Sequence, residues 1–97
     1  MSEKREKAIT RLYKLCFYFV DDILDEEDKE HDECDGNISA LKDCIRETRD
    51  VLNFLKDEDN VVEEWRLVGI NAMFDNCNEE RIIPYDLPLA IKGILCI

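Results

Sequence analysis

The chain has 97 residues, which is enough for one domain with a single hydrophobic core. Its 45% apolar content predicts a folded protein, and the presence of only three glycines and two prolines favours long helices. The net charge of −11 argues against nucleic acid and anionic membranes as partners, because both attract basic surfaces.

The cysteines and the hydropathy pattern predict a soluble cytoplasmic protein. Five cysteines, an odd number without any C-x-x-C pair, are typical of a reducing compartment, and we expect free thiols. The apolar run "LYKLCFYFV" is interrupted by Lys14 and is followed by no small-residue cleavage site, so we expect no signal peptide. No apolar run approaches the length of a membrane span, which is about 18 residues.

The first predicted helix begins at about Ser2, a plausible N-cap. Its apolar residues recur every three or four positions, at Ile9, Leu12, Cys16, Phe19 and Ile23. A second apolar stripe is formed by Tyr13, Phe17, Val20 and Leu24. A helix that is apolar nearly all round is usually buried, so we expect this stripe in the core, with a docking surface as the less favoured alternative.

Two further helices follow. The second is predicted from Asn37 or Ser39 to about Lys56, with an apolar face made of Ile38, Leu41, Ile45, Leu52 and Leu55. After a turn at "DEDN", Asn60 and Glu63 have the spacing of a capping box. The third helix would bury Val61, Trp65, Val68, Ala72 and Met73 and would end at "DNCN".

The C-terminal segment, residues 79–97, permits two structures. Asp86 can cap a short helix that has Pro88 in its first turn, whereas "ERIIPY" and "GILCI" could form short strands. We favour the helix. The sequence therefore predicts an all-α fold, in which residues 1–97 form a single acidic domain, a bundle of about four helices.

The stretch "EHDECDGNISALK" resembles a calcium-binding loop in part. With Gly36 at position 6 of such a loop, position 1 is His31 and position 12 is Lys42, so the two strongest ligands are missing. We interpret the stretch as a polar connection in which Gly36 ends one helix and Asn37 starts the next. His31, Cys34 and Cys44 lack a fourth zinc ligand. We expect no metal and no cofactor.

The sequence also gives little indication of catalysis. His31 is the only histidine, and the carboxylates around it disfavour a thiolate at Cys34, so this pair is a poor nucleophile. No glycine-rich phosphate loop is present, and the abundant carboxylates lie in a solvated run rather than in an apolar pocket. We expect a protein that is not an enzyme.

Charge is distributed unevenly along the chain. Residues 1–20 have five cations against two carboxylates, a net charge of +3, whereas residues 21–36 have ten carboxylates against Lys29, a net charge of −9. A run of this kind is self-repelling and is either a solubilising surface or a recognition surface. Its candidate binding residues are Asp22, Asp25, Glu26, Glu27, Asp28, Glu30, Asp32, Glu33 and Asp35.

These features favour an acidic protein that inhibits a basic partner by electrostatic complementarity. The predicted function is that of an immunity protein or antitoxin that neutralises a nuclease-type toxin; an inhibitor that imitates nucleic acid is a second possibility. A third is an assembly or adaptor module that docks through the aromatic face of the first helix, with Tyr13, Phe17 and Tyr18 as anchors.

Overall fold

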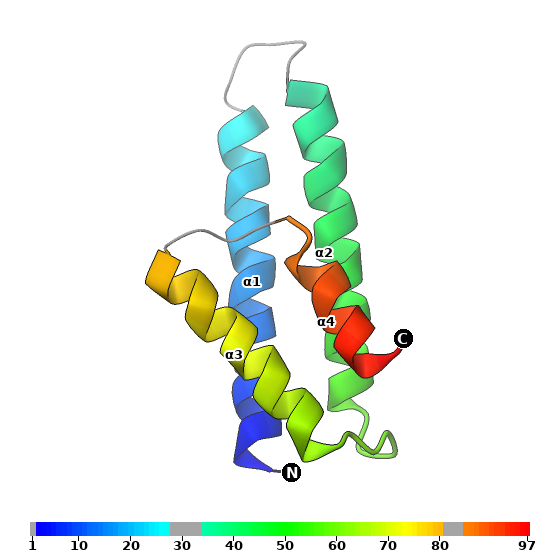
Figure 1. The fold of residues 1–97 in the computed structure, drawn as a ribbon. Coiled ribbons are helices and arrows are strands. Elements are labelled where there is room, and N and C mark those ends of the chain that lie inside the picture. Colours follow the sequence, from blue (N-terminus) through cyan, green and yellow to red (C-terminus); the bar gives the residue numbers. More distant parts are fainter. Residues whose placement is uncertain (1, 28–33, 81–84) are drawn as a thin grey trace.

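The computed structural model describes residues 2–27, 34–80 and 85–97, with the backbone alone for 25–27, 34–37 and 78–80. These ranges contain four helices and no strand (Figure 1). The helices are α1 (Glu3–Glu27), α2 (Cys34–Lys56), α3 (Glu64–Glu80) and α4 (Leu87–Leu95). The predicted all-α fold of about four helices is confirmed.

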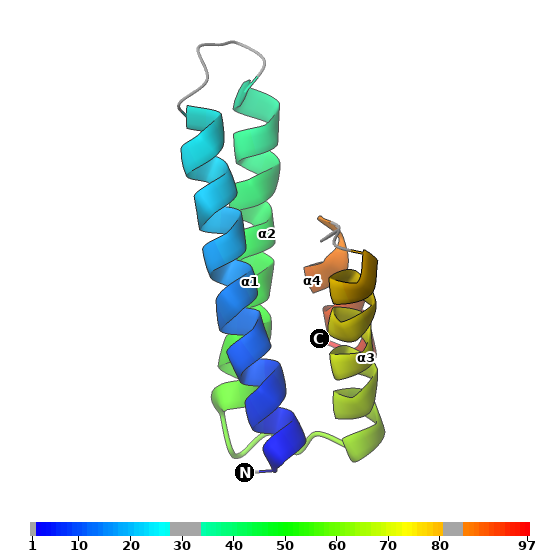
Figure 2. The ribbon, with the colours of Figure 1, turned by 90° about the vertical axis from the view of Figure 1, so that its left-hand side faces the viewer.

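Helices α1 and α2 run antiparallel and form a long hairpin (Figure 1). Helix α3 packs on α1, and α4 packs on α2 and on α3. Viewed from the side, α3 and α4 both lie on the same side of the hairpin (Figure 2). Within the part of the chain that the structure describes, the opposite face of the hairpin is therefore covered by no helix.

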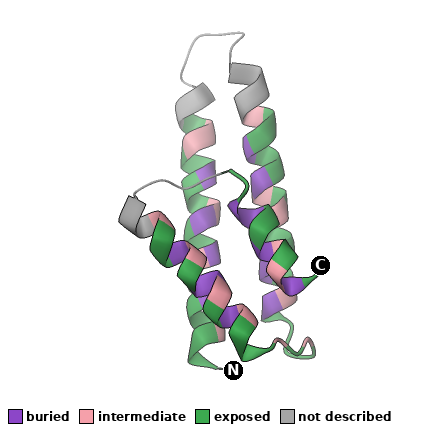
Figure 3. Cartoon of the chain, in the orientation of Figure 1, coloured by how far each residue is buried: buried purple, intermediate pink, exposed green. Residues whose placement is uncertain are grey.

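The core lies between the hairpin and the two shorter helices (Figure 3). Helix α1 contributes Ala8, Leu12, Leu15 and Phe19, which we call the inner stripe. The other core residues are Leu41, Cys44, Val51, Leu52 and Leu55 of α2, Leu67, Ile70 and Phe74 of α3, and Leu87, Ile91 and Leu95 of α4. Each fully buried leucine or phenylalanine stabilises the fold by about 1.5–3 kcal/mol relative to an exposed one.

The start of α1 agrees with the sequence prediction, because the backbone N–H of Arg5 donates to Ser2 Oγ at 3.2 Å, as an N-cap requires. The predicted start of α2 is wrong. The helix begins at Cys34 rather than at Asn37 or Ser39, so Gly36 lies in its first turn and ends no helix. A glycine costs only about 1 kcal/mol in a helix, and Asp35 is an acidic residue placed where the helix dipole favours one.

The predicted limits of α3 are also wrong. The helix begins at Glu64 and continues through "DNCN" to Glu80. Asn60 does not cap it: Asn60 Nδ2 donates to the carbonyl of Phe54 at 3.1 Å and so satisfies the end of α2. The carbonyl of Glu63 accepts the first hydrogen bond of α3, from Arg66 N at 3.0 Å.

Helix α3 buries a different face from the predicted one. Of the five residues predicted to be buried, Val61, Trp65, Val68 and Ala72 are exposed and only Met73 is half-buried against the core. The buried residues are Leu67, Ile70, Asn71 and Phe74. Asn71 joins this face because its Nδ2 donates to the carbonyls of Lys4, at 3.2 Å, and Leu67, at 3.1 Å. Apolar residues occur on both sides of α3, so the apolar pattern alone selected the wrong face.

The short C-terminal helix is confirmed. Asp86 occupies the N-cap position of α4 and Pro88 lies in its first turn, although the Asp86 side chain makes no capping hydrogen bond. In "GILCI", the first three residues end this helix, Cys96 is its C-cap and Ile97 follows it, so the segment forms no strand. In "ERIIPY", residues 81–84 lie outside the described residues.

Arginine side chains join the helices at their ends. Arg5 donates to three backbone carbonyls, those of Leu55 at 2.8 Å, Asp57 at 2.8 Å and Asn60 at 2.9 Å. These carbonyls belong to the end of α2 and the turn after it, where the helix leaves acceptors unsatisfied. Arg66 similarly donates to the carbonyl of Ile94 near the end of α4.

We expect Arg5→Lys to destabilise the fold, because an ammonium group cannot match a planar fork that reaches three carbonyls. The expected loss of unfolding free energy is about 1–3 kcal/mol, measured by urea unfolding. The control is Lys42→Gln, an exposed residue of α2, which should change the unfolding free energy by less than about 0.5 kcal/mol. Equal effects of the two substitutions would show that the Arg5 hydrogen bonds contribute nothing.

Candidate functional site

The predicted acidic surface lies largely beyond what the structure describes. Asp22 is a half-buried residue of α1. The backbone places Asp25, Glu26 and Glu27 in the last turn of α1 and Asp35 in the first turn of α2, at the same end of the hairpin (Figure 1). The other four predicted residues lie outside the described residues: Asp28, Glu30, Asp32 and Glu33. The acidic recognition surface therefore stays a prediction.

Three carboxylate residues in the last turn of α1 do not favour the helix. The C-terminal end of a helix carries the negative end of its dipole, so each acidic residue there is disfavoured by roughly 0.3–1 kcal/mol. Asp21 and Asp25 add a repulsive pair four residues apart. This end of the hairpin is thus acidic without a benefit to helix stability.

The second apolar stripe of α1 is exposed. Phe17 is 67% and Leu24 54% exposed, while Tyr13 and Val20 are each 40% exposed. We call these four residues the outer stripe. The prediction that they are buried is wrong, because α3 and α4 cover the inner stripe, which lies about 140° away around the helix axis.

Tyr18 does not belong to the outer stripe. It follows Phe17 directly and therefore lies about 100° from it around the helix. Its ring packs against Phe19, edge to face, with 5.7 Å between the centroids. The predicted anchor set of Tyr13, Phe17 and Tyr18 thus occupies two faces, and Val20 and Leu24 are the residues that share a face with Phe17.

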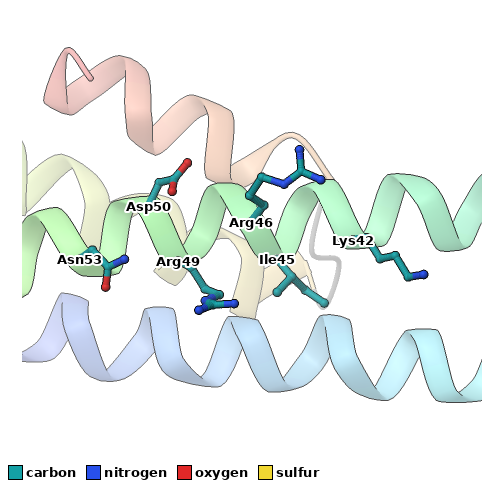
Figure 4. A pocket seen from close by; sticks show the side chains of 6 residues that line it. All are labelled: Lys42, Ile45, Arg46, Arg49, Asp50 and Asn53. Carbon is teal, nitrogen blue, oxygen red and sulfur yellow. The ribbon is translucent and has the colours of Figure 1, made fainter.

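A basic groove lies on α2, and helix α1 runs alongside it (Figure 4). The groove is open, has a volume of about 280 Å³ and is lined by Lys42, Ile45, Arg46, Arg49, Asp50 and Asn53. Ile45 and Arg49 point toward α1. Arg46 pairs with Asp43 at 3.4 Å, and Asp50 pairs with Lys92 at 3.1 Å.

Two cations of α2 border α1. Lys56 Nζ lies 5.4 Å from the centroid of the Tyr13 ring, and Arg49 is close enough to Cys16 to lower the pKa of its thiol. Sequence reasoning missed this basic face because residues 37–60 have a net charge of −2. The sequence did contain an indication of this face: Lys42, Arg46, Arg49 and Lys56 follow one another at intervals of four, three and seven residues, which place them on one side of a helix.

Two cysteines in the described part, Cys16 and Cys44, have a raised thiol pKa. Cys16, Cys44, Cys77 and Cys96 form no disulfide, as the sequence predicts, and the side chain of Cys34 is not described. Burial raises the pKa of Cys16, against the opposing effect of Arg49. Burial also raises the pKa of Cys44, and nearby carboxylates, led by Glu47, raise it further. A protonated thiol is a weak nucleophile and a weak metal ligand.

The stretch that resembles a calcium-binding loop is helical where it is described, from Cys34 to Lys42. Of the soft ligands considered for zinc, His31 lies outside the described residues and Cys44 Sγ donates to the carbonyl of Tyr85 at 3.1 Å. Among the described residues, no group of three or more histidine, cysteine or acidic side chains could hold a metal ion. Nor does any helix within those ranges have the length and apolarity to cross a membrane.

Comparison with known proteins returned no match to this chain, whether among protein-family models, curated proteins or solved structures. In its described part, the chain is a protein of four helices with an exposed apolar stripe on α1 and three acidic residues in the last turn of that helix.

The raised thiol pKa values predict that stability decreases in alkaline solution. In the folded chain, Cys16 and Cys44 keep their protons to higher pH than in the unfolded chain. Their contribution is complete below the pKa of an unfolded cysteine and is lost as the pH rises through the folded pKa values, so the unfolding free energy should fall above about pH 8.5.

The measurement is urea unfolding under reducing conditions between about pH 7 and pH 10. Cys44→Ala removes one of the two groups and should make the decrease with pH shallower than in the parent chain, whatever its effect at pH 7. An unchanged slope in this variant would contradict the proposed role of the Cys44 thiol.

Proposed function

We propose that the protein is a non-enzymatic assembly or adaptor module that binds another protein through the outer stripe of α1. The observation that supports the proposal is the exposure of Tyr13, Phe17, Val20 and Leu24 on one continuous face of the helix. Contiguous exposed apolar surface gives the isolated fold no benefit and is a common feature of protein-binding sites. Covering it with a partner gains roughly 25 cal/mol for each Å² of apolar area removed from water.

The surroundings of the stripe fit a binding surface as well. Lys14 and Asp21 are exposed on α1, Lys56 of α2 borders the stripe at Tyr13, and Arg49 of α2 lies near Cys16. Apolar anchors at the centre with charged groups around them are the usual arrangement of a protein interface, in which aromatic residues contribute most of the affinity. Phe17, the most exposed residue of the stripe, is the proposed principal anchor.

A second candidate is the inhibitor of a basic partner, such as a nuclease-type toxin or a nucleic-acid-binding protein. It is supported by the −9 charge of residues 21–36, and the described parts of this segment, residues 21–27 and 34–36, lie at one end of the hairpin. The acidic residues in the last turn of α1, which the helix dipole disfavours, agree with a role in recognition rather than in stability. Such a partner would be steered by charge, so its association would slow as salt screens the field.

The test is capture of binding proteins from the source cells by the immobilised chain. Phe17→Ser with Leu24→Ser should abolish capture, because it removes the two most exposed residues of the stripe. The matched control, Val68→Ser with Leu89→Ser, changes two exposed apolar residues of α3 and α4 and should leave capture intact. Capture should also persist from about 0.05 to about 0.5 M salt.

Two outcomes separate the candidates. Equal capture by the outer-stripe variant and the parent chain overturns the proposed surface. Loss of capture in high salt, and on replacement of Glu26, Glu27, Glu30 and Glu33 by lysine, would favour the inhibitor of a basic partner. Circular dichroism of each variant confirms that the comparison is made between folded proteins.

A further inference from the structure

We propose that the partner at the outer stripe is a second copy of this chain, packed antiparallel along α1 about a twofold axis. This inference rests on the proposed function, because it uses the same surface and identifies its occupant. Two independent properties of α1 support it. One is the spacing of the exposed apolar residues, and the other is the order of the charges beside them.

The spacing of the outer stripe is symmetric. Its four residues follow one another at intervals of four, three and four, which give the same pattern in both chain directions. A twofold axis between Phe17 and Val20 therefore brings Phe17 against the partner's Val20 and Tyr13 against the partner's Leu24. Alternating intervals of three and four are also those that let two helices interlock side chains along a common seam. The stripe can thus pair with itself without a shift in register.

The charges beside the stripe are complementary in the same arrangement. Lys14 follows Tyr13 and Asp21 follows Val20, so both lie on the same side of the stripe, two turns apart. Antiparallel pairing brings Lys14 to the partner's Asp21 and Asp21 to the partner's Lys14, which gives two opposite-charge pairs. Both side chains are exposed, and neither forms an ion pair within the described residues.

The charge of the whole helix agrees with this orientation. Residues 1–20 have a net charge of +3, and residues 21–27 have five carboxylates and no cation. Antiparallel packing brings the basic part of each α1 against the acidic end of the other. Parallel packing would bring the two acidic ends together, which a chain with a net charge of −11 tolerates poorly. Lys56 borders the outer stripe at Tyr13, and Arg49 lies near Cys16 of the same helix, so both add positive charge along α1.

The experiment is sedimentation equilibrium of the full chain under reducing conditions, so that none of the five cysteines links two copies through a disulfide. We expect a monomer–dimer equilibrium with a dissociation constant on the order of 10 micromolar, because a contact about twelve residues long is a small interface. Phe17→Ser should abolish the dimer up to about 500 micromolar chain.

Charge exchange tests the orientation. Lys14→Asp and Asp21→Lys should each weaken the dimer about tenfold, because each replaces two attractive pairs with two repulsive ones. An equimolar mixture of the two variants should restore the affinity to within about threefold of the parent chain, because every pair across the axis again has opposite charges. Glu58→Gln, an exposed residue in the turn after α2, is the control and should leave the dissociation constant unchanged.

Three results would overturn the proposal: a parent chain that is monomeric at about 500 micromolar, a dimer that is unaffected by Phe17→Ser, and a mixture that fails to recover. A monomeric parent chain whose capture of a different protein depends on the outer stripe refutes only the second copy and keeps the proposed function. If substitutions in the outer stripe change neither self-association nor capture of other proteins, the proposed function is wrong as well.

Discussion

The fold depends on the burial of one face of α1. The inner stripe, Ala8, Leu12, Leu15 and Phe19, is almost completely removed from water, and both α2 and α3 pack on this helix. Helix α4 packs on α2 and α3 and completes the cover on the same side of the hairpin. A chain of 97 residues with four helices has no further element in its described part to place on the other side. The outer stripe is exposed for this reason.

The basic N-terminal part of the chain has a structural role that its charge alone does not suggest. Arg5 satisfies carbonyls at the end of α2, and Arg11 joins α1 to α3 by donating to the carbonyl of Asn71 at 2.8 Å and to Asp75 at 2.6 Å. Lys7 and Lys14 are exposed and form no ion pair within the described residues. The cations of α1 are thus divided between those that hold the helices together and those that are free to meet a partner.

Periodicity predicted the features that depend on local sequence. The N-cap at Ser2, the end of α2 at Lys56 and the helix that follows Asp86 were predictable, because capping residues and a proline near Asp86 mark them directly. The buried face of α3 was not, because apolar residues lie on two faces of that helix and Asn71 enters the core through hydrogen bonds to Lys4 and Leu67. Only tertiary packing decides between the two faces.

The sequence showed which residues form the candidate surface, but it did not show that they are exposed. The outer stripe was evident as an apolar repeat, yet its exposure depends on where α3 and α4 pack, and their placement follows from contacts between distant parts of the chain. The basic face of α2 was hidden by the net negative charge of its segment. The two faces of α1 are thus separate: the inner stripe packs against the other helices, and the outer stripe is the surface that we propose for binding.

The separation of the two faces can be measured by urea unfolding of two variants, Leu12→Ala and Phe17→Ala. The chain is kept at about 1 micromolar, where association is negligible. Leu12→Ala should lower the unfolding free energy by about 2–5 kcal/mol, because it empties a fully buried site. Phe17→Ala should change it by less than about 0.5 kcal/mol, because the side chain is 67% exposed. If Phe17→Ala lowered the unfolding free energy as much as Leu12→Ala, the outer stripe would be part of the core and the two faces of α1 would not be separate.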